Sequence, residues 1–412
     1  MKKIFNILML GAIAAVAFTS CNDDDVYVED PTANQLTILS RETSFSAAPS
    51  QGTIVVDTNE PLSVSSNDQT GWISTSVEGN KVIVNVSLNE SLDGRTAMLT
   101  IKGGEKQTQV AVMQSGVIVA LDGSSNVSFN DAARTLTYNL KSNLPVEIYT
   151  NEDWIKPVYE NGVLTIDLEA NTTGHVRNGY VTYVAGPVSE EISITQADFS
   201  YLEGDYMLVY IDPDDGGMYY FDSTLKKEGT KYIVEIVDAR GRVRPIPATF
   251  TPATADLRIA AGQYVCDYTT SFKLYTVVWD TNSGYLTWAS TASMSADWLY
   301  EEEDGVAYTT GSFGDNGSWA GYAPTALLLE IFSGTPSSST RLGMAAISMV
   351  FPTLFRAEEL DAPTTASSAS VSVAKSYAAN LKARRIAELR NAKKATFFDD
   401  DPKTVNGEPI GK

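Results

Sequence analysis

Histidine and cysteine are almost absent from this 412-residue chain, which contains one His and two Cys. A catalytic triad built on histidine, a structural zinc site and a disulfide framework each need more of these residues than the chain offers. The single histidine, His175, stands in an expected loop, where we favour a solvated side chain over a proton carrier. We therefore expect neither a metal nor another cofactor.

Positive charge is also scarce. The chain has 30 Lys and Arg against 51 Asp and Glu, which gives a formal net charge of -21. Binding to phosphates requires clustered basic side chains, so this balance argues against nucleic acid as a partner. Hydrophobic residues nevertheless make up 43% of the chain, which predicts folded domains with apolar cores.

The N-terminus carries the pattern of an export signal. "MKK" is followed by an apolar run that is too short to cross a membrane, and small residues then precede Cys21. This order resembles the lipobox of bacterial lipoproteins, in which the cysteine is lipidated and becomes the first residue of the mature chain. An ordinary secretory signal with an incidental cysteine is the alternative. Residues 1–20 are thus expected to be a signal peptide and residues 21–34 an acidic tether.

Acidic residues directly follow that cysteine, in the run Asn22, Asp23, Asp24 and Asp25. The run resembles the surface-export signal of Bacteroidetes-type lipoproteins, while a solvated tether is the simpler alternative. The resemblance implies a protein that is anchored by lipid in the outer membrane and displayed on the cell surface.

A duplication occupies the next part of the chain. "NESLDGRTAMLTI" returns 82 positions later as "NTTGHVRNGYVTY", and the same offset holds over about a hundred residues. The pairs that it relates are Asn89 and Asn171, Arg95 and Arg177, Trp72 and Trp154, and Gln114 and Gln196. Runs such as "KVIVNVSL" and "VLTIDLEA" alternate apolar and polar residues, as half-buried strands do. We predict two β-sandwiches of immunoglobulin-like size, at residues 35–116 and 117–198.

These repeats resemble the BACON domain (Bacteroidetes-associated carbohydrate-binding, often N-terminal). The resemblance rests on Trp–Ile, then Asn, then Arg before a strand, and on the closing strands "VAVMQSG" and "ISITQAD". It implies modules that often act as spacers for another domain. A tryptophan that recurs beside Ile at a strand entrance predicts that Trp72 and Trp154 pack in the cores rather than stack on sugar. Arg95 and Arg177 are expected to hydrogen-bond to carbonyls of the Asn loop.

The composition changes after residue 198. Residues 199–356 hold four tryptophans and apolar runs such as "FKLYTVVWD", separated by turn signals such as Asp-Asp-Gly-Gly. We predict a larger antiparallel β domain, sandwich or barrel-like, in which "RLGMAAISMVFPTLF" is a buried strand or helix. Asp212–Gly217 fits a turn better than a calcium loop, and Cys266 fits a buried thiol.

Aromatic residues that are expected in loops supply the candidate ligand site. Planar rings suit the faces of pyranose sugars, and nearby carboxylates or amides suit their hydroxyls. The ligand-binding candidates are Trp298, Tyr300, Asp315, Asn316, Trp319 and Tyr322. Buried or hairpin-supporting roles are the alternative for each of these aromatics. Trp279 and Trp288 lie in expected strands, where core or cross-strand packing is favoured.

Residues 357–412 are expected to form a linker, a basic helix and a disordered end. The helix-prone segment 373–394 carries seven basic residues and one Glu, and it either docks on lipid headgroups or an acidic partner or stays solvated. The final "FFDDDPKTVNGEPIGK" is expected to be disordered apart from its two Phe. The whole chain is thus predicted to be all-β, with two tandem sandwiches, a larger antiparallel domain and this tail.

Together these features predict a surface lipoprotein that binds a polysaccharide or oligosaccharide through its third domain without cleaving it. A TonB-dependent transporter complex is the partner that the resemblance implies. One alternative is a structural or adhesive surface protein that binds protein. The other is a glycoside hydrolase, which needs two facing carboxylates, and no catalytic motif ranks the many carboxylates of this chain.

Overall fold

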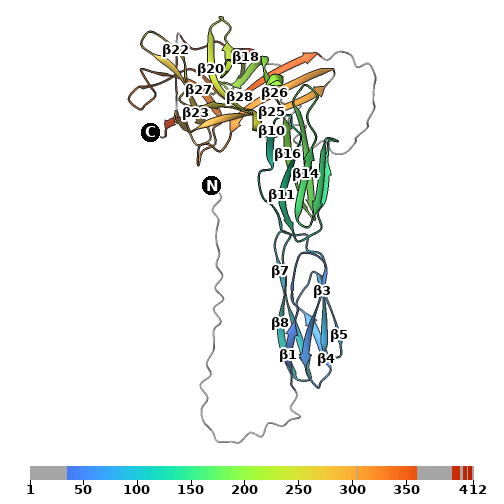
Figure 1. Ribbon diagram of the computed structural model, residues 1–412. Coiled ribbons are helices and arrows are strands. Elements are labelled where there is room, and N and C mark those ends of the chain that lie inside the picture. Colours follow the sequence, from blue (N-terminus) through green and yellow to red (C-terminus); the bar gives the residue numbers. More distant parts are fainter. Residues whose placement is uncertain (1–34, 304, 360–391, 400–401, 406, 411–412) are drawn as a thin grey trace.

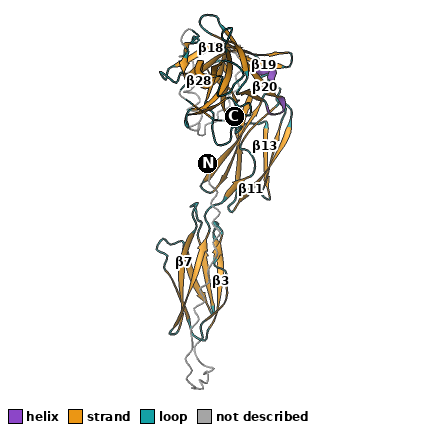
Figure 2. Cartoon of the chain, turned by 90° about the vertical axis from the view of Figure 1, so that its left-hand side faces the viewer, coloured by secondary structure: helices purple, strands orange, loops and turns teal. Residues whose placement is uncertain are grey.

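The structure is a computed structural model, and strands make up almost all of the regular secondary structure in the described part of the chain, which confirms the predicted all-β class. Figure 1 shows two slender sandwiches in a row and a broader C-terminal domain at the end of the second, and Figure 2 shows the same elongated arrangement from the side. The residues that the structure describes are 35–303, 305–359, 392–399, 402–405 and 407–410. The signal peptide, Cys21, the acidic run Asn22–Asp25 and most of the expected basic helix lie outside them.

Helical structure in the described residues is limited to two short segments. These are α1 (Phe199–Leu202), at the entrance to the C-terminal domain, and the 3-10 turn η1 (Pro252–Thr254). No described helix has the length and apolar character needed to cross a membrane.

Eight strands build the first sandwich as two sheets, with the orders β1-β3-β6-β5 and β2-β8-β7-β4. The strands are β1 (Thr37–Arg41), β2 (Ser44–Phe45), β3 (Ser50–Asp57), β4 (Leu62–Ser66), β5 (Ile73–Glu78), β6 (Lys81–Val86), β7 (Arg95–Gly103) and β8 (Lys106–Gln114). Burial alternates along β6, β7 and β8, because successive side chains of a strand point to opposite faces of its sheet. The buried faces meet in one apolar core.

The second sandwich repeats this plan, with the sheet orders β10-β16-β15-β12 and β13-β14-β11-β9. Its strands are β9 (Val119–Leu121), β10 (Asn126–Phe129), β11 (Arg134–Ser142), β12 (Glu147–Thr150), β13 (Ile155–Glu160), β14 (Val163–Leu168), β15 (Arg177–Ala185) and β16 (Val188–Gln196). In each sandwich the second strand is a short edge strand that pairs in parallel with the closing strand: β2 with β8, and β10 with β16.

The repeated tryptophans pack in the two cores, as predicted. Trp72 is 6% exposed and Trp154 is 9% exposed. An arginine covers each ring, with the guanidinium carbon of Arg95 4.6 Å from the Trp72 centroid and that of Arg177 4.1 Å from the Trp154 centroid. A cation over an indole face is attracted to it electrostatically, which stabilises the ring in addition to its burial. These tryptophans are therefore structural in both copies.

The repeated asparagine and arginine hold the loop before the seventh strand of each copy. In the first copy, Arg95 Nη2 donates to the carbonyls of Ser87 at 2.8 Å and Leu88 at 3.0 Å, and its Nε donates to Gln114 Oε1 at 2.9 Å. Asn89 is 3% exposed, and its amide donates to carbonyls within the same corner. In the second copy, 82 positions later, Arg177 donates to the carbonyl of Glu169 and to Gln196 Oε1, and Asn171 donates to the carbonyl of His175. The predicted carbonyl-binding role of the arginines is confirmed.

The C-terminal domain closes on itself as a barrel-like ring of eight antiparallel strands. The strands of the ring are arranged in their order along the chain, and β17 closes the ring by pairing with both β18 and β28. The ring strands are β17 (Gly204–Ile211), β18 (Met218–Glu228), β19 (Lys231–Val237), β20 (Val243–Thr251), β21 (Asp256–Ala260), β25 (Ser293–Glu303), β26 (Val306–Asp315) and β28 (Arg341–Glu359). The interior is packed with side chains that include Phe221 and Trp298, so the ring encloses a core.

A smaller sheet extends from one side of the ring. It is built on the first half of β28, followed by β27 (Ala326–Phe332), β23 (Lys273–Asp280) and β24 (Tyr285–Thr287), with β22 (Tyr264–Asp267) beside β23. β28 changes partners at a bend, where Phe351 adopts a φ of 50° and Pro352 follows. The segment that was ambiguous between strand and helix is thus a single bent strand.

The end of the tail returns to the C-terminal domain, which corrects the expectation of a disordered end. We call residues 392–399, 402–405 and 407–410 the C-terminal strap. Three short strands of the strap pair with the domain: β29 (Lys393–Lys394) with β18, β30 (Lys403–Thr404) with β28, and β31 (Glu408–Pro409) with β24. The first of these pairs lies where the basic helix was expected to end. The nonlocal pairing satisfies backbone groups that a solvated tail would leave to water.

A phenylalanine anchors the strap. Phe397 is 2% exposed and stacks on Phe221 with a centroid distance of 4.8 Å. Arg242 Nη1 and Arg244 Nη2 donate to the carboxylate of Asp399 at 2.8 and 2.6 Å. The apolar anchor and the ion pairs together fix a segment that is remote in sequence from its partners.

Candidate functional site

Two of the four aromatic candidates lie in a strand rather than in a loop. Trp298 and Tyr300 belong to β25, and Trp298 is 2% exposed within the core of the ring. Its ring lies over Gly311 of the neighbouring strand β26, where a Cβ atom would come within 2.6 Å. Because Trp298 lies in β25, the loop placement expected for it is wrong. Its side chain occupies space that only a glycine at position 311 leaves open.

Tyr300 contacts the second sandwich. Its ring stacks on His175 with a centroid distance of 3.9 Å and an interplanar angle of 17°. Burial, followed by a hydrogen bond to Glu302, raises the pKa of Tyr300, so its hydroxyl stays protonated and donates that bond. The solvated side chain expected for His175 is also corrected, because the imidazole is half-buried against this tyrosine.

An asparagine ties the same strand to the sandwich. Asn178 of β15 donates through Nδ2 to the carbonyl of Trp298 at 2.8 Å, and its Oδ1 accepts from the backbone N–H of Tyr300 at 2.9 Å. A side-chain amide that both donates and accepts mimics one step of strand pairing. Sandwich and ring are thus joined by directional bonds.

The other two aromatic candidates do lie in a loop, after β26. Trp319 and Tyr322 stack with a centroid distance of 4.5 Å, and Tyr285 meets the Tyr322 ring edge-on at 5.6 Å. All three are half-buried, and Trp319 also packs against the core of the ring. This aromatic cluster therefore keeps part of its surface accessible.

Asp315 and Asn316, at the end of β26, differ in how fully they are engaged. Asn316 donates to the hydroxyls of Ser293 at 3.0 Å and Ser295 at 2.8 Å, and its carbonyl oxygen accepts from Ser318 N at 3.1 Å. Asp315 is exposed and accepts from the backbone N–H of Gly317. Asn316 thus shapes the loop, while Asp315 presents a carboxylate to solvent.

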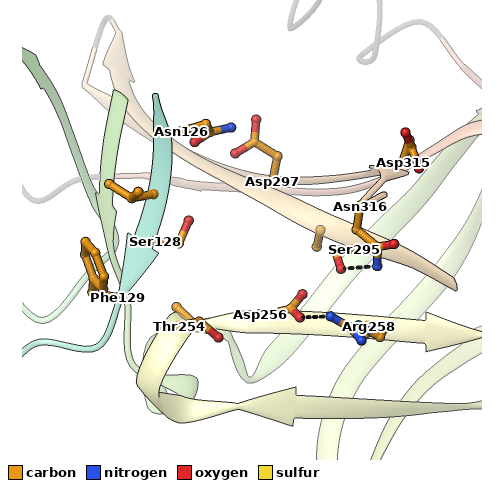
Figure 3. A pocket seen from close by; sticks show the side chains of 13 residues that line it. Asn126, Ser128, Phe129, Thr254, Asp256, Arg258, Ser295, Asp297, Asp315 and Asn316 are labelled. Carbon is orange, nitrogen blue, oxygen red and sulfur yellow. Dashed lines mark hydrogen bonds and ion pairs between the residues drawn. The ribbon is translucent and has the colours of Figure 1, made fainter. Parts of the chain in front are cut away.

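A groove of about 500 Å³ lies at the seam between the second sandwich and the ring. β10 of the sandwich forms one wall, and η1, β21, β25 and the end of β26 form the rest (Figure 3). The polar side chains that line it are Asn126, Ser128, Thr254, Asp256, Arg258, Ser295, Asp297, Asp315 and Asn316. Of the six sequence candidates, only Asp315 and Asn316 belong to this lining.

The groove carries more negative than positive charge. Three carboxylates, of Asp256, Asp297 and Asp315, line it together with one guanidinium, that of Arg258. Arg258 Nη2 pairs with Asp256 at 2.8 Å, so these two charges largely offset each other. Asp315 adds an exposed carboxylate, and the amide and hydroxyl side chains of the lining add further hydrogen-bond acceptors.

Most of this lining cannot be predicted from the sequence, because two separate domains supply it. Asn126 and Ser128 lie in an edge strand of the sandwich, whereas Asp256 and Asp297 lie in ring strands. Each stands as a polar residue in an alternating strand, which is the ordinary pattern of a solvent-facing position. No local signal separates such residues from the rest of the surface.

The remaining chemically distinctive residues have structural roles. Asp212 and Gly217 close the predicted turn by backbone bonds, and Lys403 pairs with Asp214 at 2.6 Å. Cys266 is half-buried in β22, and burial raises the pKa of its thiol. Among the described residues, no group of His, Cys, Asp or Glu is placed to hold a metal ion.

One carboxylate has a strongly perturbed pKa, but it does not line the groove. Glu330 of β27 is fully buried, and this burial raises its pKa to about 7 although Arg341 Nε donates to its Oε1 at 2.6 Å. Its Oε2 has no hydrogen-bond partner, which explains why desolvation outweighs the nearby positive charge.

Comparisons with known proteins extend over part of the chain. Among solved structures, it is similar to a Bacteroides ovatus GH5 xyloglucanase in complex with a XXXG heptasaccharide, at 24% identity and a TM-score of 0.19. That match covers 24% of this chain and 22% of the enzyme, so the chain spans less than a quarter of its length. A protein from Bacteroides thetaiotaomicron, solved by NMR, matches at 16% identity and a TM-score of 0.19, over 24% of this chain and 98% of that one.

A tandem of titin domains, I9–I11, matches at 9% identity and a TM-score of 0.29, over 68% of this chain and 95% of that one. The comparison with curated proteins found no match. The model of the BACON family, described as "Putative binding domain, N-terminal", matches residues 62–115 and 145–197, one stretch in each sandwich. The two N-terminal sandwiches are therefore BACON domains, as their Trp, Asn, Arg and Gln pattern predicted.

Proposed function

We propose that this protein is a lipoprotein of the outer membrane, anchored through Cys21 and displayed on the cell surface, that binds glycan without cleaving it. The N-terminal pattern up to Asp25 supports the anchor and the export, and the two BACON domains support a role at a distance from the membrane. A TonB-dependent transporter complex is the partner that fits such a protein.

The observation that carries the glycan proposal is the polar groove at the seam. Its volume of about 500 Å³ lies in the usual range for small-ligand sites. Sugar hydroxyls donate and accept hydrogen bonds, and the groove offers carboxylates, amides and hydroxyls for both. Asp297 and Asn126 approach each other from opposite walls, so one ligand can reach both domains (Figure 3).

The charge of the groove supports an uncharged glycan. A polyanionic polysaccharide would bring its own carboxylates or sulfates beside Asp297 and Asp315, and like charges at short range repel. The net charge of -21 of the whole chain acts in the same direction at longer range. Neutral hexose units, whose hydroxyls donate to carboxylates, fit this lining.

The aromatic cluster after β26 supplies the remaining part of the proposed site. We retain Trp319 and Tyr322 as candidates for contact with a sugar, because they are half-buried and follow Asp315 closely in the chain. Trp298 is enclosed in the core and Tyr300 faces His175, so neither is retained. An aromatic ring suits the apolar face of a pyranose.

Binding is better supported than hydrolysis. Glycoside hydrolysis uses a carboxylic acid with a raised pKa that faces a second carboxylate across the bond to be cut. Glu330 is the carboxylate whose pKa is raised to about 7, yet it is buried beside Arg341 and lies outside the groove. The groove carboxylates therefore serve recognition in this proposal.

Affinity electrophoresis in native gels tests the glycan proposal. Protein that lacks residues 1–21 should be retarded in gels that contain neutral polysaccharides and not in gels that contain polyuronic or sulfated ones. Asp297→Asn and Asp315→Asn should weaken the retardation, whereas Asp57→Asn, an exposed change in the first sandwich, should not. No shift of the unmodified protein across a broad panel would favour the adhesive alternative instead.

The anchor needs its own test. Cys21→Ser should abolish metabolic labelling with a fatty-acid analogue and release the protein from the membrane fraction. Replacing Asp23, Asp24 and Asp25 by Ala should keep the label but remove sensitivity to protease added to intact cells. Labelling of the Cys21→Ser protein would contradict the proposed anchor.

A further inference from the structure

We infer that the second BACON domain forms one wall of the binding groove and contacts the ligand. Only the first BACON domain serves as a spacer alone. This inference rests on the proposed glycan function. It assigns different roles to two domains of the same family, although each has its own apolar core and the same kind of polar corner.

The edge strand β10 is the part of the second sandwich that reaches the groove. Its side chains alternate: Val127 and Phe129 pack against the sandwich core, while Asn126 and Ser128 point to the opposite side. Figure 3 shows Asn126 extending toward Asp297, and the hydroxyl of Ser128 directed toward the space between the walls. A ligand in the groove therefore meets polar atoms of the sandwich directly.

The first sandwich has the same edge without a second wall. Phe45 of β2 pairs in register with Gln114, as Phe129 of β10 pairs with Gln196, so Ser44 occupies the place of Ser128. The residues around Ser44 line a surface depression that is bounded by the first sandwich alone. The duplicated edge is thus open in one copy and faces the ring in the other.

Directional contacts hold the two walls of the groove at a fixed separation. Asn178 makes two hydrogen bonds to β25, the strand that also carries Asp297. His175 stacks on Tyr300 of the same strand. A second tie lies at the domain entrance, where Arg356 of β28 donates to the carbonyls of Tyr201 at 2.7 Å and Glu203 at 3.3 Å. Because these contacts already fix the position of β10, ligand binding does not incur the entropic cost of ordering this wall.

A matched pair of substitutions tests the inference. In the neutral polysaccharide that retards the unmodified protein, Asn126→Ala and Ser128→Ala should each raise the dissociation constant about two- to tenfold, the loss of one hydrogen bond. Ser44→Ala, the equivalent change in the first sandwich, should leave it unchanged. If both β10 variants bind like the unmodified protein while Asp297→Asn does not, the wall belongs to the ring alone and the inference is overturned.

Hydrogen exchange gives a second readout that requires no substitution. A neutral oligosaccharide added to the protein should slow amide exchange in residues 126–129 of the sandwich and in residues 254–258 and 295–297 of the ring. Protection that is confined to the ring segments would overturn the inference and leave the glycan function standing. Absence of binding by the unmodified protein would instead overturn the proposed function, and the inference with it.

Discussion

The guanidinium of Arg177 lies over the ring of Trp154, 4.1 Å from its centroid, and the same contact recurs 82 positions earlier. Trp154 is 9% exposed, so both faces of its ring are used within the sandwich. A buried indole that also meets a cation contributes through its apolar area and through the charge.

Trp154→Ala should therefore lower the free energy of unfolding of the second sandwich by about 3–5 kcal/mol, the range for a large aromatic removed from a core. Urea unfolding measures the change. Tyr149→Ala, which removes a 53% exposed ring from the same sandwich, is the control and should cost less than about 1 kcal/mol. Equal losses for the two variants would argue against a structural role for the tryptophan.

Gly311→Ala should destabilise the ring, because the new Cβ would lie 2.6 Å from the ring of Trp298. Crowding of this kind costs about 1–3 kcal/mol, and thermal unfolding measures it. Gly314→Ala, in the same strand with open space at its Cβ position, is the matched control. Unfolding of the Gly314 variant at the lower temperature would contradict the close packing described for Trp298.

Phe397→Ala tests whether the C-terminal strap is part of the fold. The ring stacks on Phe221 and is 2% exposed, so we expect a loss of about 3–5 kcal/mol in the unfolding free energy of the C-terminal domain. Phe351→Ala removes a ring that is 48% exposed and should cost far less. A Phe397 variant as stable as the unmodified protein would mean that the strap contributes no stability.

Glu330 should make stability depend on pH in an unusual direction. Its pKa is about 7 in the folded protein and near 4.5 in the unfolded chain, so between these values the folded state binds more protons. This contribution of Glu330 to the free energy of unfolding is fully present below pH 4.5 and is lost as pH rises through 7, by on the order of 3 kcal/mol. Chemical unfolding of the unmodified protein and of Glu330→Gln across this range should show a difference that changes with pH. Parallel curves would contradict the raised pKa.

The two sandwiches could be predicted closely because their strand patterns are local in sequence and occur in two copies. Trp72 and Trp154 recur beside Ile at strand entrances, and the arginines recur before the same strand, so the duplication itself separated core residues from surface ones. Trp298 was misplaced although Met294, Ala296 and Trp298 alternate with less buried residues along β25. Glu301, Glu302 and Glu303, which follow Tyr300, favour a loop, but the alternation is the stronger signal.

The groove and the strap could not be predicted in the same way. Asn126 and Asp297 line one groove only because two domains dock, and Phe397 stacks on Phe221 across more than a hundred and seventy residues of chain. Contacts between residues so far apart in sequence depend on the complete tertiary structure. Neither local propensity nor periodicity predicts them.

The strap also has a consequence for where the C-terminal domain can be cut. Phe397 is a buried residue of that domain, and β30 and β31 pair with its strands β28 and β24. A fragment that stops at the end of β28 would expose the face of Phe221 that Phe397 covers. An isolated domain that keeps the native core therefore has to extend through residue 410.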